Sequence, residues 1–284
     1  MATTFDSGEF RDGQRQQWNS AATGWRKWSE LIDGAASGIS ESLVALAGVE
    51  PGGRVLDVAA GYGEPSLTAA RAVGAEGRVV ATDISAEMIA YGRERAAGAG
   101  LENIEFVESD AASLSFPQES FDAALSRWGI IFEPDAEAAA ARIRGFLKPG
   151  ARMAISSWGT PDRVPMLGLP MRTAMQRLDV PPPAPGTPGP LSRPTFEALG
   201  GVLEAAGFSD VEVEDAEVEM EWPSAAEFTT FVKEIAPPIT AMLAPHPPEV
   251  QDATWAAITE AVREAAGSGP VRFSNQALLA AGRA

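Results

Sequence analysis

Residues 54–74 read RVLDVAAGYGEPSLTAARAVG and set the pattern for the fold. A short apolar run, typical of a buried strand, is followed by a turn with Gly61 and Gly63 and then by a segment of helical spacing that ends in glycine. The turn has the outline of a nucleotide-binding loop. It lacks the Lys-Ser/Thr of a P-loop, however, and has Ala59 where a dinucleotide fingerprint would begin with glycine. No phosphate motif therefore identifies the ligand of this loop.

The alternation of strand-like and helix-like segments continues from residue 53 to residue 158. Ser85 stands where the N-cap of a helix is expected, and Pro134 opens a later helix that Pro149 follows. Strands that alternate with helices pair in parallel through right-handed crossovers, so we expect a doubly wound α/β sheet whose ligands lie beyond the carboxyl ends of its strands. The expected strands are 54–59, 77–83, 103–110, 120–128 and 151–158, and the expected helices are 65–74, 85–100 and 134–150.

The flanks of this region have a different character. Residues 160–194 hold ten of the 22 prolines, so we expect a lid or an extended connection there instead of a helix or a central strand. A helix at 195–207 precedes an alternating segment, 210–222, whose single buried face is typical of an antiparallel or edge strand. A pair of helices within about 224–266 and a last strand at 271–282 complete the expected elements.

The composition excludes several classes of function. The chain has 284 residues, 45% of them hydrophobic, a net charge of −17, no cysteine and one histidine. Disulfides, thiolate metal sites, a cysteine nucleophile and a histidine-rich metal site are therefore excluded, and we expect no metal. The negative charge disfavours nucleic acids and anionic membranes and favours a neutral or cationic small molecule. Neither a signal peptide nor a membrane span is indicated, so we expect a cytoplasmic monomer or homodimer.

Polar residues stand at the ends of four successive expected strands. Asp57 ends the first strand, and Asp83 ends the second, twenty residues beyond Gly63, where a carboxylate can hydrogen-bond the two hydroxyls of a ribose. Asp110 ends the third strand and can accept from an adenine amino group, while the next backbone N–H can donate to a ring nitrogen. The fourth strand ends in Ser-Arg-Trp at 126–128. In this order and spacing, the four strand ends predict one adenosine-shaped cleft.

As a set, these motifs resemble the class I S-adenosylmethionine-dependent methyltransferases, especially the branch like ubiquinone and menaquinone biosynthesis methyltransferases. The resemblance covers roughly residues 15–220 and is strongest over 53–158, in VLDVAAGYGEPSLTAA, VVATDISAEMIAYGRERA, IEFVESDAASLSFPQESFDAALSRWGIIFEPD and LKPGARMAISSW. It implies a Rossmann-like seven-stranded sheet whose last strand is antiparallel. It also implies S-adenosyl-L-methionine as cofactor and S-adenosyl-L-homocysteine as product.

The resemblance assigns a role to each motif position. Ala59 departs from the family, which usually has glycine there. The residues implied to bind the cofactor are Asp57, Ala59, Gly61 and Gly63 around the methionine part, Asp83 at the ribose, Ile84 and Met88 on the adenine face, and Asp110 with Ala111 at the adenine edge.

An N-terminal helix is a further point of resemblance. In that branch it carries an aromatic pair, seven residues apart, that closes over the cofactor, and Trp18 and Trp25 match the two positions. Residues spaced by seven share a helix face, so packing of both indoles on the core is the alternative. A sulfonium near an aromatic ring gains about 0.5–2 kcal/mol from the ring quadrupole, which gives the pair a purpose at a cofactor site.

These expectations divide the chain into four regions. Residues 1–45 form a helical cap and 46–159 the Rossmann-like core that binds the cofactor. Residues 160–195 form the proline-rich lid or connection. Residues 196–284 complete the sheet and carry a helical insertion, about 224–266, over the acceptor pocket.

The sequence motifs indicate the residues that contact the acceptor less clearly than those of the cofactor site. Trp128 and Trp158 end strands and should border the substrate pocket. Arg127 is a candidate for cofactor contact and for catalysis, with an ion pair to a nearby carboxylate as the structural alternative. His246 is the candidate base because histidine titrates near neutral pH, although a single histidine in a proline-rich loop is usually just solvated.

The expected function is methyl transfer to an O, N or C nucleophile of a small molecule, for example a quinol or a secondary metabolite. The protein would align donor and acceptor and exclude water. Three alternatives stay open: an S-adenosylmethionine-binding protein with a regulatory or non-methyltransfer function, a nicotinamide-dependent oxidoreductase, and a methyltransferase for proteins. The oxidoreductase is disfavoured because the loop lacks the full glycine fingerprint. Family motifs leave the acceptor open.

Overall fold

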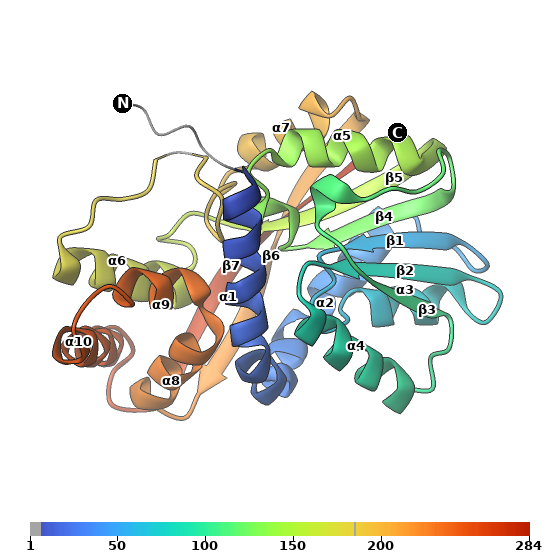
Figure 1. Cartoon of the computed structure of the whole chain (residues 1–284). Helices are drawn as coiled ribbons and strands as arrows, with labels where there is room; N and C mark the ends of the chain where they lie inside the picture. The colour runs from blue at the N-terminus through green and yellow to red at the C-terminus, as the bar shows by residue number, and fades with distance from the viewer. Residues whose placement is uncertain (1–6, 185) are drawn as a thin grey trace.

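A seven-stranded mixed sheet forms the centre of the protein (Figure 1). The computed structural model describes residues 7–184 and 186–284. The strand order is β3-β2-β1-β4-β5-β7-β6, with β1 to β5 parallel and β7 antiparallel to both of its neighbours. The strands are β1 (Arg54–Val58), β2 (Arg78–Asp83), β3 (Ile104–Glu108), β4 (Phe121–Arg127), β5 (Leu147–Trp158), β6 (Ser209–Trp222) and β7 (Val271–Arg283). The expected doubly wound sheet with an antiparallel last strand is confirmed.

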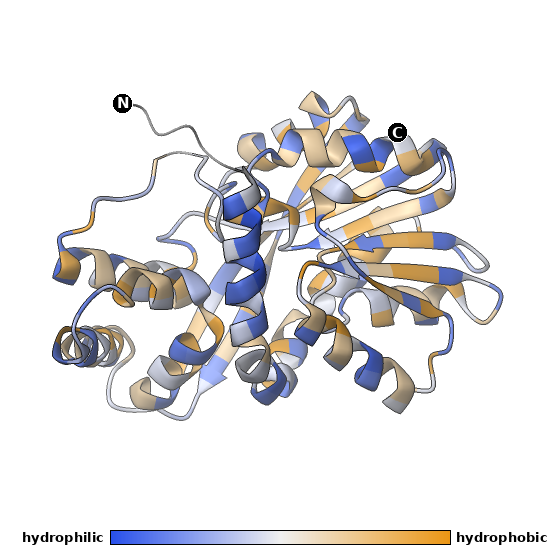
Figure 2. Cartoon of the chain, viewed as in Figure 1, coloured by the Kyte–Doolittle hydropathy of each residue, from blue (hydrophilic) through white to orange (hydrophobic). Residues whose placement is uncertain are grey.

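Helices cover both faces of the sheet because successive residues of a strand point to opposite sides. Val55 packs on the side of α2 and α3, while the next residue, Leu56, packs on the side of α5 and α7. Figure 2 shows the apolar colour along the central strands that follows from this double burial. The helices are α1 (Ser7–Lys27), α2 (Ser29–Leu46), α3 (Ser66–Val73), α4 (Ala86–Gly98), α5 (Ala136–Phe146), α6 (Pro165–Leu178), α7 (Phe196–Ala205), α8 (Ala225–Ile235), α9 (Pro237–Leu243) and α10 (Pro248–Ala266), with the short 3-10 helices η1 (Ala111–Ser113) and η2 (Ile130–Phe132).

The first helix stands at the carboxyl ends of the strands, between the sheet and the group α6, α8, α9 and α10 (Figure 1). Ser85 caps α4 as expected, since its hydroxyl oxygen accepts a hydrogen bond from the Met88 N–H at 3.2 Å. The same hydroxyl donates to the Asn19 side chain of α1 at 2.7 Å. The cap of α4 therefore also fixes α1 at the edge where ligands of this fold bind.

Two helical segments differ from the sequence expectation. The proline-rich segment contains a regular helix, α6, because Pro165 takes its first position, where no N–H is needed, and only Pro170 falls inside it. The expected pair of helices near 224–266 is a set of three, since Pro237 and Pro238 start a new helix, α9, directly after α8. Among residues 7–184 and 186–284, none of the helices is long and apolar enough to cross a membrane.

Candidate functional site

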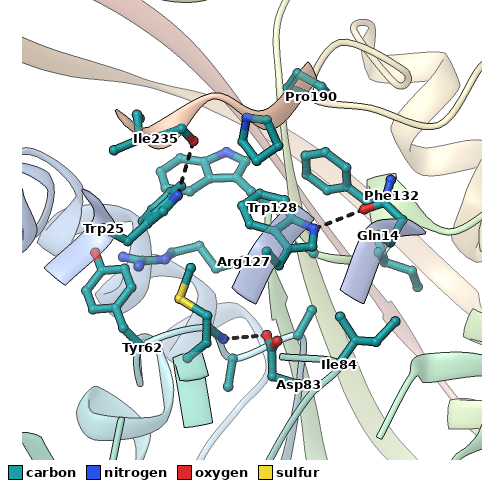
Figure 3. Close-up of a pocket in the computed structure, with 18 of the residues that line it drawn as sticks. Gln14, Trp25, Tyr62, Asp83, Ile84, Arg127, Trp128, Phe132, Pro190 and Ile235 are labelled. Atoms are coloured by element: carbon teal, nitrogen blue, oxygen red, sulfur yellow. Dashed lines mark hydrogen bonds between the residues drawn. The ribbon is translucent and has the colours of Figure 1, made fainter. Parts of the chain in front are cut away.

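A deep cavity opens at the carboxyl ends of β1 to β5, beneath α1 (Figure 3). Its lining contains residues from each strand end on which the sequence had placed a ligand contact. It lies where the strand order reverses between β1 and β4, the usual ligand position in a doubly wound sheet. The predicted residues that line it are Trp18, Trp25, Ala59, Gly61, Asp83, Ile84, Met88, Asp110, Ala111, Arg127, Trp128 and Trp158.

The end of β2 holds a buried carboxylate directly over the glycine loop. Asp83 accepts hydrogen bonds from the backbone N–H groups of Gly61 and Ser85, each at 2.8 Å. Burial nevertheless raises the pKa of Asp83 to about 6, against the lowering effect of these N–H donors. The geometry fixes the carboxylate at the cavity wall, where the hydroxyls of a ribose would find an acceptor.

Gly61 leaves bare backbone at the cavity. Its φ of +54° favours glycine, and apart from its two neighbours no described residue lies within 4 Å of the place a Cβ would take. Ala59 also has a positive φ, +58°, although it is not glycine. Its methyl group fits because residue 129 is glycine, and a Cβ there would stand only 2.4 Å from the Ala59 Cβ. The departure from the family pattern is thus accommodated by a neighbouring strand end.

Two of the residues predicted to surround the methionine part lie behind the cavity wall. Asp57 is completely buried and accepts a hydrogen bond from the Ser66 hydroxyl at 2.5 Å, while its Oδ1 atom has no partner. Burial raises the pKa of Asp57 to about 7. Gly63 packs against Leu67 and Gly92 instead of lining the cavity. Both residues support the loop without facing the open space.

The end of β3 carries charged groups that the sequence patterns did not indicate. Arg11 of α1 pairs with Asp110 at 3.6 Å. Burial, together with the charge of Asp110, raises the pKa of Glu133 to about 7. A helical wheel could have found Arg11, because it precedes Trp18 by seven residues and shares its face. Glu133 had no such signal, since it follows β4 and reaches this place only through the fold.

The indoles of α1 form an aromatic wall over the cavity. The Trp18 ring lies 6.1 Å from that of Trp25 and 5.2 Å from that of Phe132, both edge-on, measured between centroids. The Trp25 Nε1 donates to the Ile235 carbonyl at 3.2 Å, and the Trp18 Nε1 donates to the Gln14 side chain at 3.0 Å (Figure 3). Both rings therefore face the cavity while their N–H groups are satisfied at its rim.

The other half of the cavity is built from elements that are far apart in the sequence. Trp128 and Trp158 stack with centroids 4.2 Å apart and nearly parallel rings. All lining residues from α2, β5, α6, β6, α8 and the start of α9 are apolar. They are Ile32, Ala36, Trp158, Met166, Leu167, Val218, Met220, Phe231, Ile235, Ala236, Pro237 and Pro238. We call this set the apolar half of the cavity.

Arg127 lies at the junction of the two halves. It is buried at the end of β4, and its guanidinium donates to the Ser40 hydroxyl at 3.0 Å. In Figure 3 the side chain extends between Trp25 and Tyr62. None of the ion pairs formed by residues 7–184 and 186–284 includes Arg127. The nearest sign of such a pairing is the charge of Arg127 acting on the buried Asp57 carboxyl, whose pKa burial raises and this charge lowers.

His246 is not brought to the cavity. It lies half-buried in the turn between α9 and α10, where its carbonyl accepts from the Gln251 side chain at 2.8 Å. It is not among the lining residues. We therefore assign His246 no role in the site.

Comparison with known proteins agrees with the topology and the strand-end motifs. A family model described as a methyltransferase domain matches residues 55–150, which hold all the predicted cofactor contacts except those of α1. This part of the chain is similar to a methyltransferase domain. A ubiquinone/menaquinone biosynthesis C-methyltransferase from Teredinibacter turnerae is 38% identical to it over 120 residues, which are 42% of this chain and 48% of that protein.

Solved structures extend the similarity beyond the methyltransferase domain. A phosphoethanolamine N-methyltransferase from Haemonchus contortus aligns with a TM-score of 0.57 and 19% identity, covering 96% of this chain and 59% of that one. The cyclase SpnF aligns with a TM-score of 0.54 and 22% identity, covering 87% and 81%. At this identity the likeness concerns the fold. The curated relatives are matched over 41% to 59% of their own length, so the chain spans about half of them.

Proposed function

We propose that this protein is an S-adenosyl-L-methionine-dependent methyltransferase for a small-molecule acceptor. The observation that carries the proposal is the row of strand ends along one cavity: the glycine loop after β1, Asp83 after β2, and Asp110 with Ala111 after β3. These groups offer an open backbone, a buried carboxylate acceptor and an adjacent acceptor and N–H donor. That set suits an amino-acid part, a ribose and an adenine, in this order along the wall.

The residues present fit this cofactor. Bare backbone at Gly61 leaves room for close approach, and the Asp83 carboxylate is fixed by two N–H donors before any ligand arrives. Ile84 and Met88 supply apolar surface beside it. The indoles of Trp18 and Trp25 would face the cationic sulfonium, which a ring face stabilises.

When bound, S-adenosylmethionine supplies an electrophilic methyl group. The protein's own contribution is then to position the acceptor and to exclude water. The stacked Trp128 and Trp158 give a flat apolar surface for the acceptor, and α1 with α8 closes the cavity through the Trp25 hydrogen bond to Ile235. Alignment of two bound partners in a dry site is a large part of the catalysis available to methyl transfer.

The relatives support a small acceptor and leave its identity open. One of them is named a ubiquinone/menaquinone biosynthesis C-methyltransferase, and a protein of the same fold is named a phosphoethanolamine N-methyltransferase. The enclosed apolar half of this cavity suits a small apolar acceptor better than a protein segment.

A second function has one specific observation in its favour. The cyclase SpnF has the same fold, and in the apolar half of this cavity the lining holds no titratable base. A protein that binds S-adenosylmethionine without transferring its methyl group is therefore the competing proposal, since fold alone does not fix the chemistry.

Calorimetry followed by a turnover screen tests the proposal. The full chain is first titrated with S-adenosylmethionine and S-adenosylhomocysteine, and it should bind both. It is then incubated with S-adenosylmethionine and a panel of phenols, quinol precursors, amines and carboxylic acids, with release of S-adenosylhomocysteine as readout. Release with one class of acceptor supports a methyltransferase, tight binding without release supports the competing proposal, and no binding contradicts both.

A further inference from the structure

The guanidinium of Arg127 is a buried charge that forms no direct ion pair among the described residues, although the charge of the buried Asp57 acts on it. Burying a cation is costly unless it is paired, and an arginine in a protein interior normally has a carboxylate partner. Here the direct partner is a hydroxyl. The Ser40 hydroxyl accepts from Arg127 at 3.0 Å, and the Tyr62 hydroxyl, which donates to Asp33 at 2.9 Å, lies near the guanidinium. This bond helps to hold the guanidinium in place and leaves some of its five N–H donors for a ligand.

Three carboxylates of this region are already engaged. The charges of Asp57 and Arg127 interact, but Asp57 is hydrogen-bonded to Ser66 and does not line the cavity. Asp33 binds Tyr62 and Arg95. Asp83 binds the backbone of the glycine loop. An anion that arrives in the cavity would therefore meet Arg127 without displacing a protein partner.

Arg127 lies beside the apolar half, next to α2 and to the Trp128 ring. Ser40, its hydrogen-bond partner, lies one helical turn after Ala36, which lines that half, and the Arg127 guanidinium lies 5.3 Å from the centre of the Trp128 ring. The apolar half itself contributes no acid, amine, imidazole or thiol to the lining. An acceptor bound there has no protein base within this set, which favours a nucleophile that needs no deprotonation near pH 7, and a carboxylate is such a nucleophile.

We propose that the acceptor is an apolar carboxylic acid whose carboxylate is bound by Arg127. This inference rests on the proposed function. The planar guanidinium matches the two oxygens of a carboxylate. One carboxylate oxygen forms a bond to the methyl carbon while the carbon–sulfur bond breaks and its electron pair stays on sulfur. The products are a methyl ester and a neutral thioether, and no proton is moved.

The overall charge of −17 favours a neutral or cationic ligand, but local chemistry outweighs net charge inside the cavity. Exposed carboxylates lie in solvent, where salt screens them over about 8 Å. The Arg127 charge is buried and acts at contact distance within the cavity. It therefore offers an anionic group a cationic partner beside the apolar half, although Glu64, Asp83, Asp110 and Glu133 also line the cavity.

The test compares acids with their uncharged amides. The full chain, saturated with S-adenosylhomocysteine, is titrated with 2-naphthoate, octanoate, 2-naphthamide and octanamide. We expect at least one acid to bind tenfold or more tightly than its amide, and its methyl ester to form when S-adenosylmethionine replaces the product. The Arg127→Gln variant should lose the preference for the acid, and Arg127→Lys should keep part of it. Equal binding of acids and amides by the wild-type protein, or an acid preference that survives in Arg127→Gln, overturns the proposal.

A second arm separates the acceptor from the cofactor, which has a carboxylate of its own. If Arg127 bound that group, Arg127→Gln would weaken S-adenosylhomocysteine at least tenfold and leave 5′-methylthioadenosine, which lacks it, unaffected; that result also overturns the proposal. Arg172→Gln, at an exposed arginine outside the lining, should keep the acid preference. If wild-type protein binds no S-adenosylhomocysteine, the proposed function fails, and the acid and amide titrations of the protein alone still report on Arg127.

Discussion

At the scale of single residues, the contact between Ala59 and Gly129 shows how one strand end adapts to another. Ala59 has φ +58°, which costs a non-glycine residue about 1–2 kcal/mol, and its methyl group occupies the space that a side chain at residue 129 would need. The two positions are therefore coupled, although they are seventy residues apart in the sequence.

We expect Gly129→Ala to lower the free energy of unfolding by about 1–3 kcal/mol, because its Cβ would stand 2.4 Å from that of Ala59. Adding Ala59→Gly should restore part of the loss and not all of it, since the Ser126 hydroxyl would still lie 2.8 Å away. Chemical denaturation of both single variants and the double variant measures the coupling. Additive effects of the two substitutions would contradict it.

A second prediction at this scale concerns Asp83. Asp83→Ala should weaken S-adenosylmethionine binding by about 1.5–3 kcal/mol, because it removes a charged hydrogen-bond acceptor from the ribose position. Isothermal calorimetry measures the change. Asp83→Asn keeps an acceptor for the loop and checks that the fold survives, and Asp162→Asn, at an exposed carboxylate, is the control. Unchanged affinity in Asp83→Ala would rule out its ribose role.

At the scale of elements, α1 depends on a close approach to α8. A Cβ at Gly24 would stand 2.2 Å from the Glu234 carbonyl oxygen, and the nearby Trp28 and Lys27 side chains both bind the Glu234 carboxylate. Gly24→Ala should push the two helices apart, lower the free energy of unfolding by about 1–3 kcal/mol and weaken cofactor binding, because α1 carries the indoles of the cavity.

The same helix offers a matched control. At Gly13 no described atom outside the adjacent residues and the nearby backbone of α1 lies within 4 Å of the place a Cβ would take, so Gly13→Ala should raise stability by about 0.5–1 kcal/mol through helix propensity alone. Thermal unfolding and calorimetric titration of both variants separate the two effects. If Gly24→Ala behaved like Gly13→Ala, the contact between α1 and α8 would have no part in the site.

Local sequence patterns were enough to predict the helices and strands that depend on neighbouring residues in the chain. Alternation of strands and helices indicated the parallel sheet, and the motif at 54–74 placed the cavity at the right strand ends. The interpretation of prolines was less successful. Pro165 starts a helix in a segment expected to have none, because a proline at the first helical position loses no hydrogen bond.

At the scale of the whole molecule, the sequence predicts one half of the site much better than the other. The cofactor half comes mainly from consecutive strand ends, so motif spacing could find it. The apolar half joins α2, α6, β6 and α8, and the setting of Arg127 depends on Ser40, 87 residues earlier. No pattern in one sequence records such contacts, since they form only when distant segments pack. His246 illustrates the converse, a chemically suitable residue that the fold leaves outside the cavity.

The last prediction also belongs to this scale, because several buried carboxyl groups shift the stability of the whole chain with pH. Burial raises the pKa of Asp57 to about 7, of Asp83 to about 6 and of Glu133 to about 7. In the unfolded chain these groups titrate near pH 4. Between pH 4 and 7 the folded protein therefore binds more protons than the unfolded one, so its stability falls as pH rises.

Without cofactor, we expect the melting temperature to rise by about 3 °C or more as the pH is lowered from 8 to 5.5, since each pKa unit between the two states corresponds to about 1.4 kcal/mol. The smaller negative net charge at low pH also stabilises the fold, so the decisive comparison is with Asp57→Asn. This variant removes one carboxyl with a raised pKa and should make the melting temperature depend less on pH. The control Asp162→Asn should leave that dependence unchanged. The carboxyls of Asp122 and Glu234, whose pKa values are lowered by Lys148 and Lys27, act the opposite way only below about pH 4.5. A melting temperature that is constant or falls between pH 8 and 5.5 would show that the three buried carboxyls are ionised at little cost, and the raised pKa of Asp83 would then have no bearing on cofactor binding.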